Sequence, residues 1–315
     1  MMRGRMHQRK QFHSPGEEIP VRDETTGLFP PLNLPVRHYE IDGRPYVLLT
    51  PERLVMKKDL LVPREDDVLV ATYPRNGTGF TLNLCMEIHK IHNPDLPADH
   101  PFFTPLLRNR TPWVHNKFTE EEVDISGMAS PRVLKTHNYY PHLNIEPGSL
   151  RIIHVMRNPK DVVCSHFYHM TSTHKRLFEY EGNFQETVEY FLDGGFETGC
   201  YWQFNREFME NKDGHNILRL YYEELTSKRE DGVRKINAFL GYEKLSDEQV
   251  EAVVKATTLD YENLRKNQVG KPGKAMTMMN KEQRERFDER CRKEFGGFEG
   301  IPESFFSEDG YVEQQ

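Results

Sequence analysis

The chain has 315 residues, of which 37% are hydrophobic and 29% are charged, and its net charge is −7. This size and composition suit one large α/β domain with a packed core, and the acidic balance argues against general binding of nucleic acids or anionic membranes. Residues 1–20 are basic and polar, without the apolar segment of a signal peptide, and no run approaches the ~18 apolar residues of a membrane helix. The four cysteines form no C-x-x-C pair, so we expect a cytoplasmic protein with free thiols and no membrane or nucleic-acid partner.

The chain divides by composition into an N-terminal extension over residues 1–34, a domain over residues 35–305 and a C-terminal tail over residues 306–315. The extension is polar and ends in prolines, a composition typical of a disordered or tag-like segment, and we assign it no function. Asp42-Gly43 stands between two short runs that contain alternating apolar residues. This pattern predicts a β-hairpin with a two-residue turn.

Residues 68–84 contain the most informative pattern. An apolar run over residues 68–73 predicts a buried strand, Pro74 ends it, and Arg75-Asn-Gly-Thr-Gly79 follows. A helix-like pattern then begins at Phe80. A strand, a glycine loop and a helix form a cradle whose backbone N–H groups bind phosphates. The loop is P-loop-like, but it lacks the Lys-Ser/Thr of a Walker A motif, and an ordinary strand-to-helix turn with two glycines is the alternative.

Three further strands are predicted, over residues 132–136, 150–156 and 216–222. Helices alternate with them: one from Pro159 to about Ser172, a pair over 184–211, one over 233–240 closed by Gly241, one after the capping box of Ser246 and Gln249, and one after that of Asn280 and Gln283. This alternation predicts an α/β fold, a single domain with a central parallel sheet flanked by helices. Ligands bind at the carboxyl ends of such strands, where Arg75, His137 and Arg157 would meet.

These strand ends carry charged and hydrogen-bonding side chains. Arg75 and the glycine loop could hold one phosphate-like group, and Arg157 with Ser165 could hold a second anion. Lys135 and His137 are two residues apart on one strand, so they share a face. A histidine beside cations is a candidate general base that accepts a hydroxyl proton. The alternative for His137 is a hydrogen-bonded histidine at a strand end without a catalytic role.

Three other patterns are less specific. The proline-rich segment 93–118 contains Phe102, Phe103 and Trp113, which would either line a hydrophobic pocket or pin a surface loop. The basic segment 263–274 would either cover an anionic ligand or form a solvated loop. The histidines lack the ligand spacing of a zinc site, so no metal is expected.

Six segments resemble the motifs of cytosolic sulfotransferases, in the order of that family and over roughly residues 37–290. They are Tyr73-Pro-Arg-Asn-Gly-Thr-Gly-Phe80 for the phosphosulfate loop Y-P-K-S-G-T-[TS]-[WF], Arg110-Thr-Pro-Trp113 for R-x-P-[FW], Leu134-Lys-Thr-His137 for L-K-[ST]-H, Val155-Met-Arg-Asn-Pro-Lys-Asp-Val-Val-Cys-Ser165 for V-x-R-N-x-K-D-V-x-x-S, Tyr222-Glu-Glu-Leu225 for Y-E-D-[ML], and Arg265-Lys266 for the R-K-G that opens the last cofactor loop. Each match is weak by itself, and together they are specific.

The resemblance implies transfer of a sulfuryl group from 3′-phosphoadenosine 5′-phosphosulfate (PAPS) to a hydroxyl or amine of a small hydrophobic acceptor, leaving the 3′,5′-bisphosphate (PAP). His137 would be the general base, and Arg75 and Lys135 would stabilise charge on the transferring group. The residues implied to bind the donor are Arg75, Asn76, Gly77, Thr78, Gly79 and Phe80 around the phosphosulfate, Arg157, Ser165, Arg265 and Lys266 at the 3′-phosphate, and Phe80, Trp202 and Thr257 at the adenine. Phe102, Phe103 and Trp113 would line the acceptor pocket. No metal is implied, because a sulfuryl group carries less charge than the phosphoryl group that magnesium neutralises in kinases.

The chain departs from the family pattern at several positions. Arg75 replaces a lysine, which keeps the charge but changes its shape, and Asn76 and Gly79 replace hydroxyl residues. Asn267 replaces the glycine after Arg-Lys, and the family's dimer motif is poorly matched around residues 276–285, which leaves a homodimer through that contact in doubt. Two alternatives to an active sulfotransferase stay open: a protein that binds PAPS or PAP with little turnover, and a nucleotide or small-molecule kinase.

Overall fold

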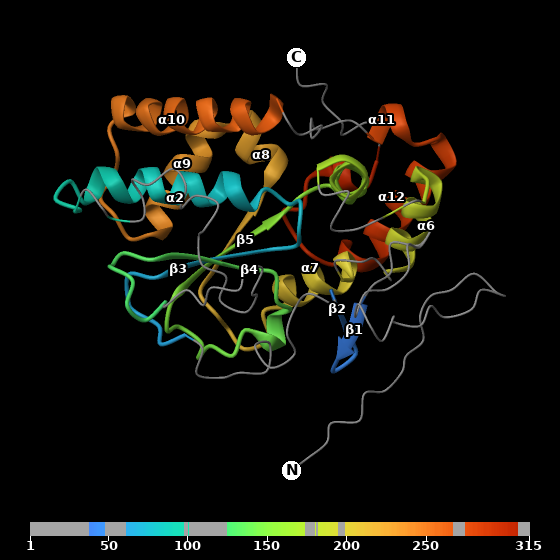
Figure 1. Ribbon diagram of the computed structural model, residues 1–315, viewed down its shortest axis with the longest axis horizontal. Helices are drawn as coiled ribbons and strands as arrows, with labels where there is room; N and C mark the ends of the chain where they lie inside the picture. The colour runs from blue at the N-terminus through green and yellow to red at the C-terminus, as the bar shows by residue number, and fades with distance from the viewer. Residues whose placement is uncertain are drawn as a thin grey trace, which may run out of the picture.

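The computed structural model describes residues 38–47, 61–97, 100, 125–173, 180, 182–194, 199–266 and 275–307, without the side chains of residues 38–40, 47, 172–173 and 259–266. Its centre is a parallel four-stranded sheet (Figure 1). The strands are β3 (Val68–Thr72), β4 (Val133–Thr136), β5 (Arg151–Met156) and β6 (Ile217–Tyr221), in the order β4-β3-β5-β6. The predicted α/β fold with a central parallel sheet is confirmed, and no predicted strand is wrong by more than one residue at either end.

Helices cover both faces of the sheet, because strands buried on both sides carry apolar residues on both sides. Val68 and Val70 of β3 pack in one cluster with residues of one short helix, described below, and of three longer helices. The longer helices are α2 (Thr78–His92), α9 (Arg229–Phe239) and α10 (Asp247–Lys266), which lie together on one side of the sheet in Figure 1. Leu69 and Ala71 point to the opposite face, into a second cluster. The longer helices of that cluster are α4 (Pro159–Tyr168), α6 (Phe184–Asp193), α7 (Tyr201–Glu210) and α12 (Lys281–Phe295).

Shorter elements complete the described ranges. These are α8 (Tyr222–Ser227), α11 (Ala275–Met278), a π-helical turn η3 (His169–Thr173) and the 3-10 turns η2 (Tyr140–His142) and η4 (Glu303–Phe305). Within the part of the chain that is described, no helix combines the length and the apolar character needed to cross a membrane. All four cysteines are described, and none forms a disulfide.

The helix ends follow the capping signals of the sequence. Ser246 and Gln249 exchange the two hydrogen bonds of a capping box at the start of α10, at 2.9 and 3.2 Å, and Asn280 and Gln283 do the same at α12. Gly241 follows α9 with a φ of 83°, as expected for a glycine after a helix C-terminus. The helix predicted to end at about Ser172 differs: its α-helical part ends at Tyr168, and the π-helical turn η3 continues it.

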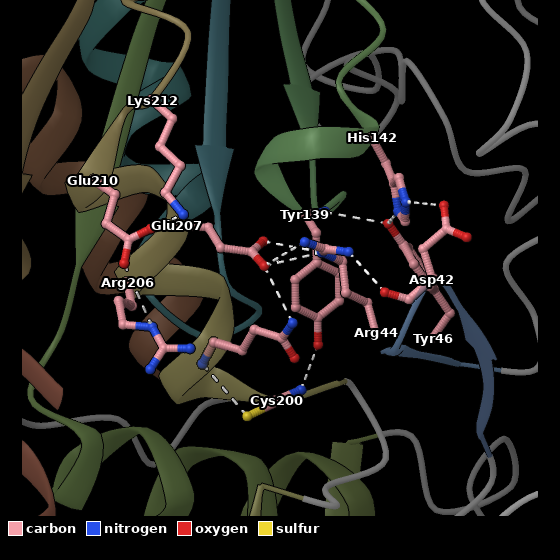
Figure 2. Close-up of polar contacts among 11 residues, drawn as sticks. Asp42, Arg44, Tyr46, Tyr139, His142, Cys200, Arg206, Glu207, Glu210 and Lys212 are labelled. Atoms are coloured by element: carbon pink, nitrogen blue, oxygen red, sulfur yellow. Dashed lines mark hydrogen bonds and ion pairs between the residues drawn. The ribbon is translucent and has the colours of Figure 1, made fainter.

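The predicted hairpin is present as β1 (His38–Ile41) and β2 (Arg44–Val47), paired antiparallel. Its turn residues Asp42 and Gly43 both have positive φ, at 49° and 75°, which is the two-residue turn that suits the twist of a hairpin. Figure 2 shows how side chains fix this hairpin to the main body. Arg44 reaches Glu207 of α7 at 2.8 Å, and the hydroxyl of Tyr46 lies 2.8 Å from Nδ1 of His142.

A buried ion pair joins the starts of β3 and β4, and its loss is predicted to destabilise the fold strongly. The guanidinium of Arg132 donates to both carboxylate oxygens of Asp67 at 2.7 and 2.5 Å, and the side chains are 1% and 0% exposed. Asp67→Ala would leave a buried cation without its counter-charge. We expect the free energy of unfolding to fall by about 3–5 kcal/mol, measured by urea denaturation.

The matched control is Lys281→Ala, which removes an ion pair with Glu285 whose partners are 77% and 58% exposed. Exposed pairs contribute less than about 1 kcal/mol, so this variant should unfold at nearly the wild-type urea concentration. Equal effects of the two substitutions would contradict the importance of the buried pair.

Buried histidines should make the fold sensitive to acid. Burial lowers the pKa of His154 to about 3 and that of His89 to about 4, whereas an unfolded histidine has a pKa of about 6.5. As the pH falls, the unfolded chain therefore binds protons at these histidines before the folded chain does. Their contribution to the free energy of unfolding is complete above pH 6.5 and is lost as the pH falls toward 4. At pH 4.5 each of these histidines should lower the free energy of unfolding by about 2–3 kcal/mol relative to pH 7.

His154→Gln isolates one of these sites, because glutamine does not titrate. The loss of unfolding free energy between pH 7 and pH 4.5, measured by urea denaturation at both pH values, should be about 2–3 kcal/mol smaller in the variant than in wild type. An identical pH dependence in the two proteins would show that His154 does not contribute.

Candidate functional site

The carboxyl ends of three neighbouring strands bring the predicted polar residues to one edge of the sheet. Because β3 lies between β4 and β5, the residues after these strands are neighbours. The ring nitrogen Nδ1 of His137, after β4, lies 2.6 Å from the carbonyl oxygen of Thr72, the last residue of β3. Arg157, after β5, donates from Nη1 to the carbonyl oxygen of Arg75 at 3.1 Å. Arg75, His137 and Arg157 therefore share one site.

The loop after β3 is a tight turn that requires glycine at one of its two positions. Gly77 has a φ of 95°, and a Cβ placed there would lie 2.4 Å from Cδ2 of Tyr222. A Cβ at Gly79 would meet nothing within 4 Å. The side chain of Asn76 is buried and donates to the carbonyl oxygen of Val155 at 3.2 Å. In the described residues no side chain caps the N-terminus of α2, so the backbone N–H groups of its first turn are suited to an anion.

The guanidinium of Arg75 lies between this loop and α4. Its Nε donates to the hydroxyl of Ser165 at 3.0 Å, and its Nη1 lies 3.4 Å from Nδ1 of His169. Burial and the charge of Arg157 lower the pKa of Arg75 to about 10, so the side chain remains a cation at pH 7. Arg75 thus connects the glycine loop to Ser165, which the sequence placed in a second anion subsite.

His137 is held as a neutral imidazole of defined tautomer. The carbonyl oxygen of Thr72 can only accept, so Nδ1 of His137 carries the proton and Nε2 has the lone pair. Burial lowers the pKa of His137 to about 3, and the charges of Lys135 and Arg75 act in the same direction. Lys135 is 8% exposed, and burial lowers its pKa to about 8. The site therefore contains a proton acceptor next to two cations.

Tyr222 is a site residue to which the sequence assigned no role. It begins α8 directly after β6, and the guanidinium of Arg157 lies over its ring at 4.7 Å. The same ring meets the ring of Phe80 edge to face at 6.4 Å and approaches Gly77. The motif Tyr-Glu-Glu after a strand was a visible signal, but its neighbours depend on the place of β6 beside β5.

The segment after Arg157 is anchored on several sides. The N–H of Asn158 donates to Glu223 at 2.8 Å, and its side chain donates to the carbonyl oxygen of Ser304 at 2.6 Å. Lys160 forms a buried ion pair with Asp288 of α12. Burial raises the pKa of Glu223 to about 7, although the Asn158 bond and the charge of Arg157 act in the opposite direction. These contacts hold the backbone from which Arg157 reaches the site.

Trp202 corrects one expectation from the sequence. Its side chain is 1% exposed, and its indole N–H donates to the carbonyl oxygen of Phe191 at 3.1 Å. It packs in the cluster of α6, α7 and α12, whereas Phe80 packs in the cluster on the opposite face of the sheet. The predicted sandwich of an adenine between Phe80 and Trp202 is therefore wrong, because Trp202 belongs to the core.

Near Phe80 the structure places other side chains. The guanidinium of Arg229 lies 5.9 Å from the centre of the Phe80 ring and donates to the hydroxyl of Thr258 on α10. Thr257, the predicted adenine contact, is 1% exposed and donates its own hydroxyl to the carbonyl oxygen of Val253 at 2.8 Å. Arg229 was not singled out by its sequence context, which is a charged surface helix.

Several predicted residues lie outside the described ranges. Phe102, Phe103 and Trp113 of the acceptor pocket belong to these, as do the side chains of Arg265 and Lys266, whose backbone ends α10. Among the described residues, no three His, Cys, Asp or Glu side chains gather as a metal site.

Comparisons with known proteins identify the family of the chain. The family model of the sulfotransferase domain matches residues 65–299. The amine sulfotransferase of Oryctolagus cuniculus is 28% identical over 269 residues, which are 78% of this chain and 86% of that protein. Sulfotransferase 1A1 of Rattus norvegicus is 32% identical over 203 residues, 61% of this chain and 65% of that protein.

Solved structures show the same fold. A crystal structure of a mouse sulfotransferase complexed with PAP superposes with a TM-score of 0.60 and 20% identity, covering 82% of this chain and 95% of that chain. Retinol dehydratase in complex with androsterone and PAP gives a TM-score of 0.62 and 19% identity, over 85% and 92% of the two chains. With the domain match over most of its length, the chain belongs to the sulfotransferase family of enzymes.

Proposed function

We propose that the protein transfers a sulfuryl group from PAPS to a hydroxyl or amine of a small hydrophobic acceptor. The observation that carries this proposal is the neutral imidazole of His137, whose Nδ1–H is bonded to Thr72 and which is flanked by Arg75 and Lys135. Relatives named for amines and for hydroxysteroids support these two acceptor classes. Two structural neighbours that were solved with PAP support the donor.

The residues present fit a donor with two anionic ends. The Gly77 turn, which a Cβ would fill, and the first turn of α2 suit the phosphosulfate. Arg157 and Ser165 are 4% and 3% exposed, and both can hydrogen-bond the 3′-phosphate. Phe80, with Tyr222 and Arg229 around it, suits the adenine in place of the expected aromatic pair. When bound, PAPS supplies the sulfuryl group and a bisphosphate leaving group.

His137 would take the proton of the acceptor at Nε2. In the protein alone its pKa of about 3 makes it a weak base, because burial and the cations Lys135 and Arg75 disfavour a further positive charge. A bound anion beside those cations would offset their charge and raise the pKa of His137, toward the range in which a general base is effective. Arg75 and Lys135 would also stabilise the charge that develops on the transferring group and its leaving oxygen.

A sulfate-transfer assay with PAPS and a panel of phenols, alcohols and amines tests the proposal. We expect turnover of at least one acceptor class, and no phosphoryl transfer when ATP and Mg²⁺ replace PAPS. A preference for ATP over PAPS would reject the proposal in favour of a kinase.

A second candidate is a protein that binds PAPS or PAP with little turnover. Its support is that the Asn76 side chain bonds to Val155, and that Gly79 has no side chain, so two hydroxyl groups of the family motif are lost from the loop. Tight PAP binding without transfer to any acceptor in the same panel would favour this candidate.

A further inference from the structure

The guanidinium of Arg75 is held at two points by one face of the helical segment after β5. Its Nε donates to Ser165 of α4 at 3.0 Å, and its Nη1 makes a longer hydrogen bond to Nδ1 of His169 at 3.4 Å. These two partners are four residues apart, which places them on the same side of a helix. The fork of an arginine provides separate donors for both, whereas a lysine has a single ammonium group at its tip. His169 was not among the predicted site residues.

His169 lies where the helix changes its geometry. It is the C-cap of α4, and its N–H bonds to the carbonyl oxygens of His166 and Ser165. The π-helical turn η3 begins at the same residue. Single π-helical turns are frequent at functional sites. Here the side chain at the change of geometry contacts the cation of the glycine loop.

The chemistry of the contact defines the state of His169. A guanidinium has only donors, so Nδ1 of His169 must accept and its proton resides on Nε2. Arg75 itself has a φ of 70°, unusual for a residue with a side chain, and its carbonyl oxygen accepts from Arg157. The backbone and the side chain of Arg75 are thus both fixed from outside the loop, as preorganised electrostatic catalysis requires.

We propose that His169 is a positioning residue that, with Ser165, orients the Arg75 guanidinium for sulfuryl transfer. The inference rests on the proposed function. It predicts that the need for His169 is tied to arginine at position 75, because all donors of a lysine ammonium lie on one nitrogen and cannot replace the separate nitrogens of the guanidinium that reach Ser165 and His169.

The test is a double-mutant cycle with kcat and PAP affinity as the two readouts. The proteins are wild type, His169→Leu, Arg75→Lys and the double variant, with PAP affinity measured by isothermal titration calorimetry. His169→Leu should lower kcat about 10–100-fold, the scale of a misplaced catalytic group, and weaken PAP binding about 3–10-fold, the loss of one modest hydrogen bond. In the Arg75→Lys background the same substitution should change either quantity by less than about 2-fold.

Two further variants separate positioning from a loosened helix. His169→Asn places an amide oxygen near the position of Nδ1, so it should restore kcat to within about 3-fold of wild type. Thr171→Val removes a hydroxyl that donates to the carbonyl oxygen of Phe167 in the same segment, and it should leave kcat and PAP affinity unchanged. Thermal unfolding of each variant reports folding separately.

The outcomes distinguish this inference from the function on which it rests. Sulfuryl transfer that is insensitive to His169→Leu, or equally sensitive in both backgrounds at position 75, overturns the role of His169 and leaves the function intact. If the wild type binds PAP without turnover, the PAP affinities of the four proteins decide the role of His169. A wild type that neither binds PAP nor transfers sulfate rejects both.

Discussion

His137→Ala is expected to slow sulfuryl transfer by about 10²–10⁴-fold, the usual effect of losing a positioned general base, while PAP affinity stays nearly unchanged. The reason is geometric: Nδ1 of His137 is occupied by the carbonyl oxygen of Thr72, which leaves Nε2 as the nitrogen that accepts the proton of the acceptor. Steady-state kinetics with a saturating acceptor give kcat, and calorimetry with PAP gives the affinity.

His154→Gln is the matched control for this experiment. His154 is also a buried histidine with a lowered pKa, but it lies within β5 and bonds to Asn205 at 3.1 Å, away from the strand ends. The His154→Gln variant should keep kcat at pH 7.5 within about 2-fold of wild type, because a buried residue outside the site contributes to stability and not to catalysis. Unchanged activity in His137→Ala would reject its assignment as the base.

Arg157→Ala is expected to weaken PAP binding by about 10²–10³-fold, which corresponds to roughly 3–4 kcal/mol. Arg157 is 4% exposed and lies over the ring of Tyr222, so its charge acts in a site shielded from water. Removing one partner of a buried, hydrogen-bonded charge pair costs about 2–5 kcal/mol. Calorimetry with PAP measures the loss, and kcat at saturating PAPS should fall much less than the affinity.

Two further substitutions, one at the same residue and one at a control residue, test this interpretation. Arg157→Lys keeps the charge but loses the bidentate fork, so its PAP affinity should lie between those of wild type and Arg157→Ala. Arg290→Ala removes a cation that lies over Trp202 on the opposite face of the sheet, and it should bind PAP like wild type. A variant Arg157→Ala with normal PAP affinity and a low kcat would place this residue at the reacting group instead of the nucleotide phosphate.

The sheet and most helix ends were accessible to reasoning from the sequence, because they depend on short-range signals. The apolar runs of β3 and β5, the capping boxes of α10 and α12 and the Asp42-Gly43 turn all appear as predicted. The end of α4 could not be predicted from the sequence, because no residue between Tyr168 and Thr173 is a helix breaker.

The sequence predicted those residues of the site that directly follow a strand. Arg75, His137 and Arg157 each stand one to three residues after a strand, and the topology of a parallel sheet collects such positions at one edge. Trp202 failed as a prediction because an aromatic residue on an amphipathic helix has the same sequence pattern whether it lines a pocket or a core. Only its neighbours, Phe191 and Phe295, assign it to the core.

Residue order alone was enough to establish the parallel sheet, the glycine loop and the strand-end positions of the charged side chains, since each follows from periodicity or from the restrictions of proline and glycine. The contacts of Arg75 with Ser165 and His169, the tautomer of His137 and the place of Tyr222 against Gly77 required the folded chain. These contacts join residues that are 65 to 145 positions apart, and no local pattern encodes which side chains meet when helices and strands pack together.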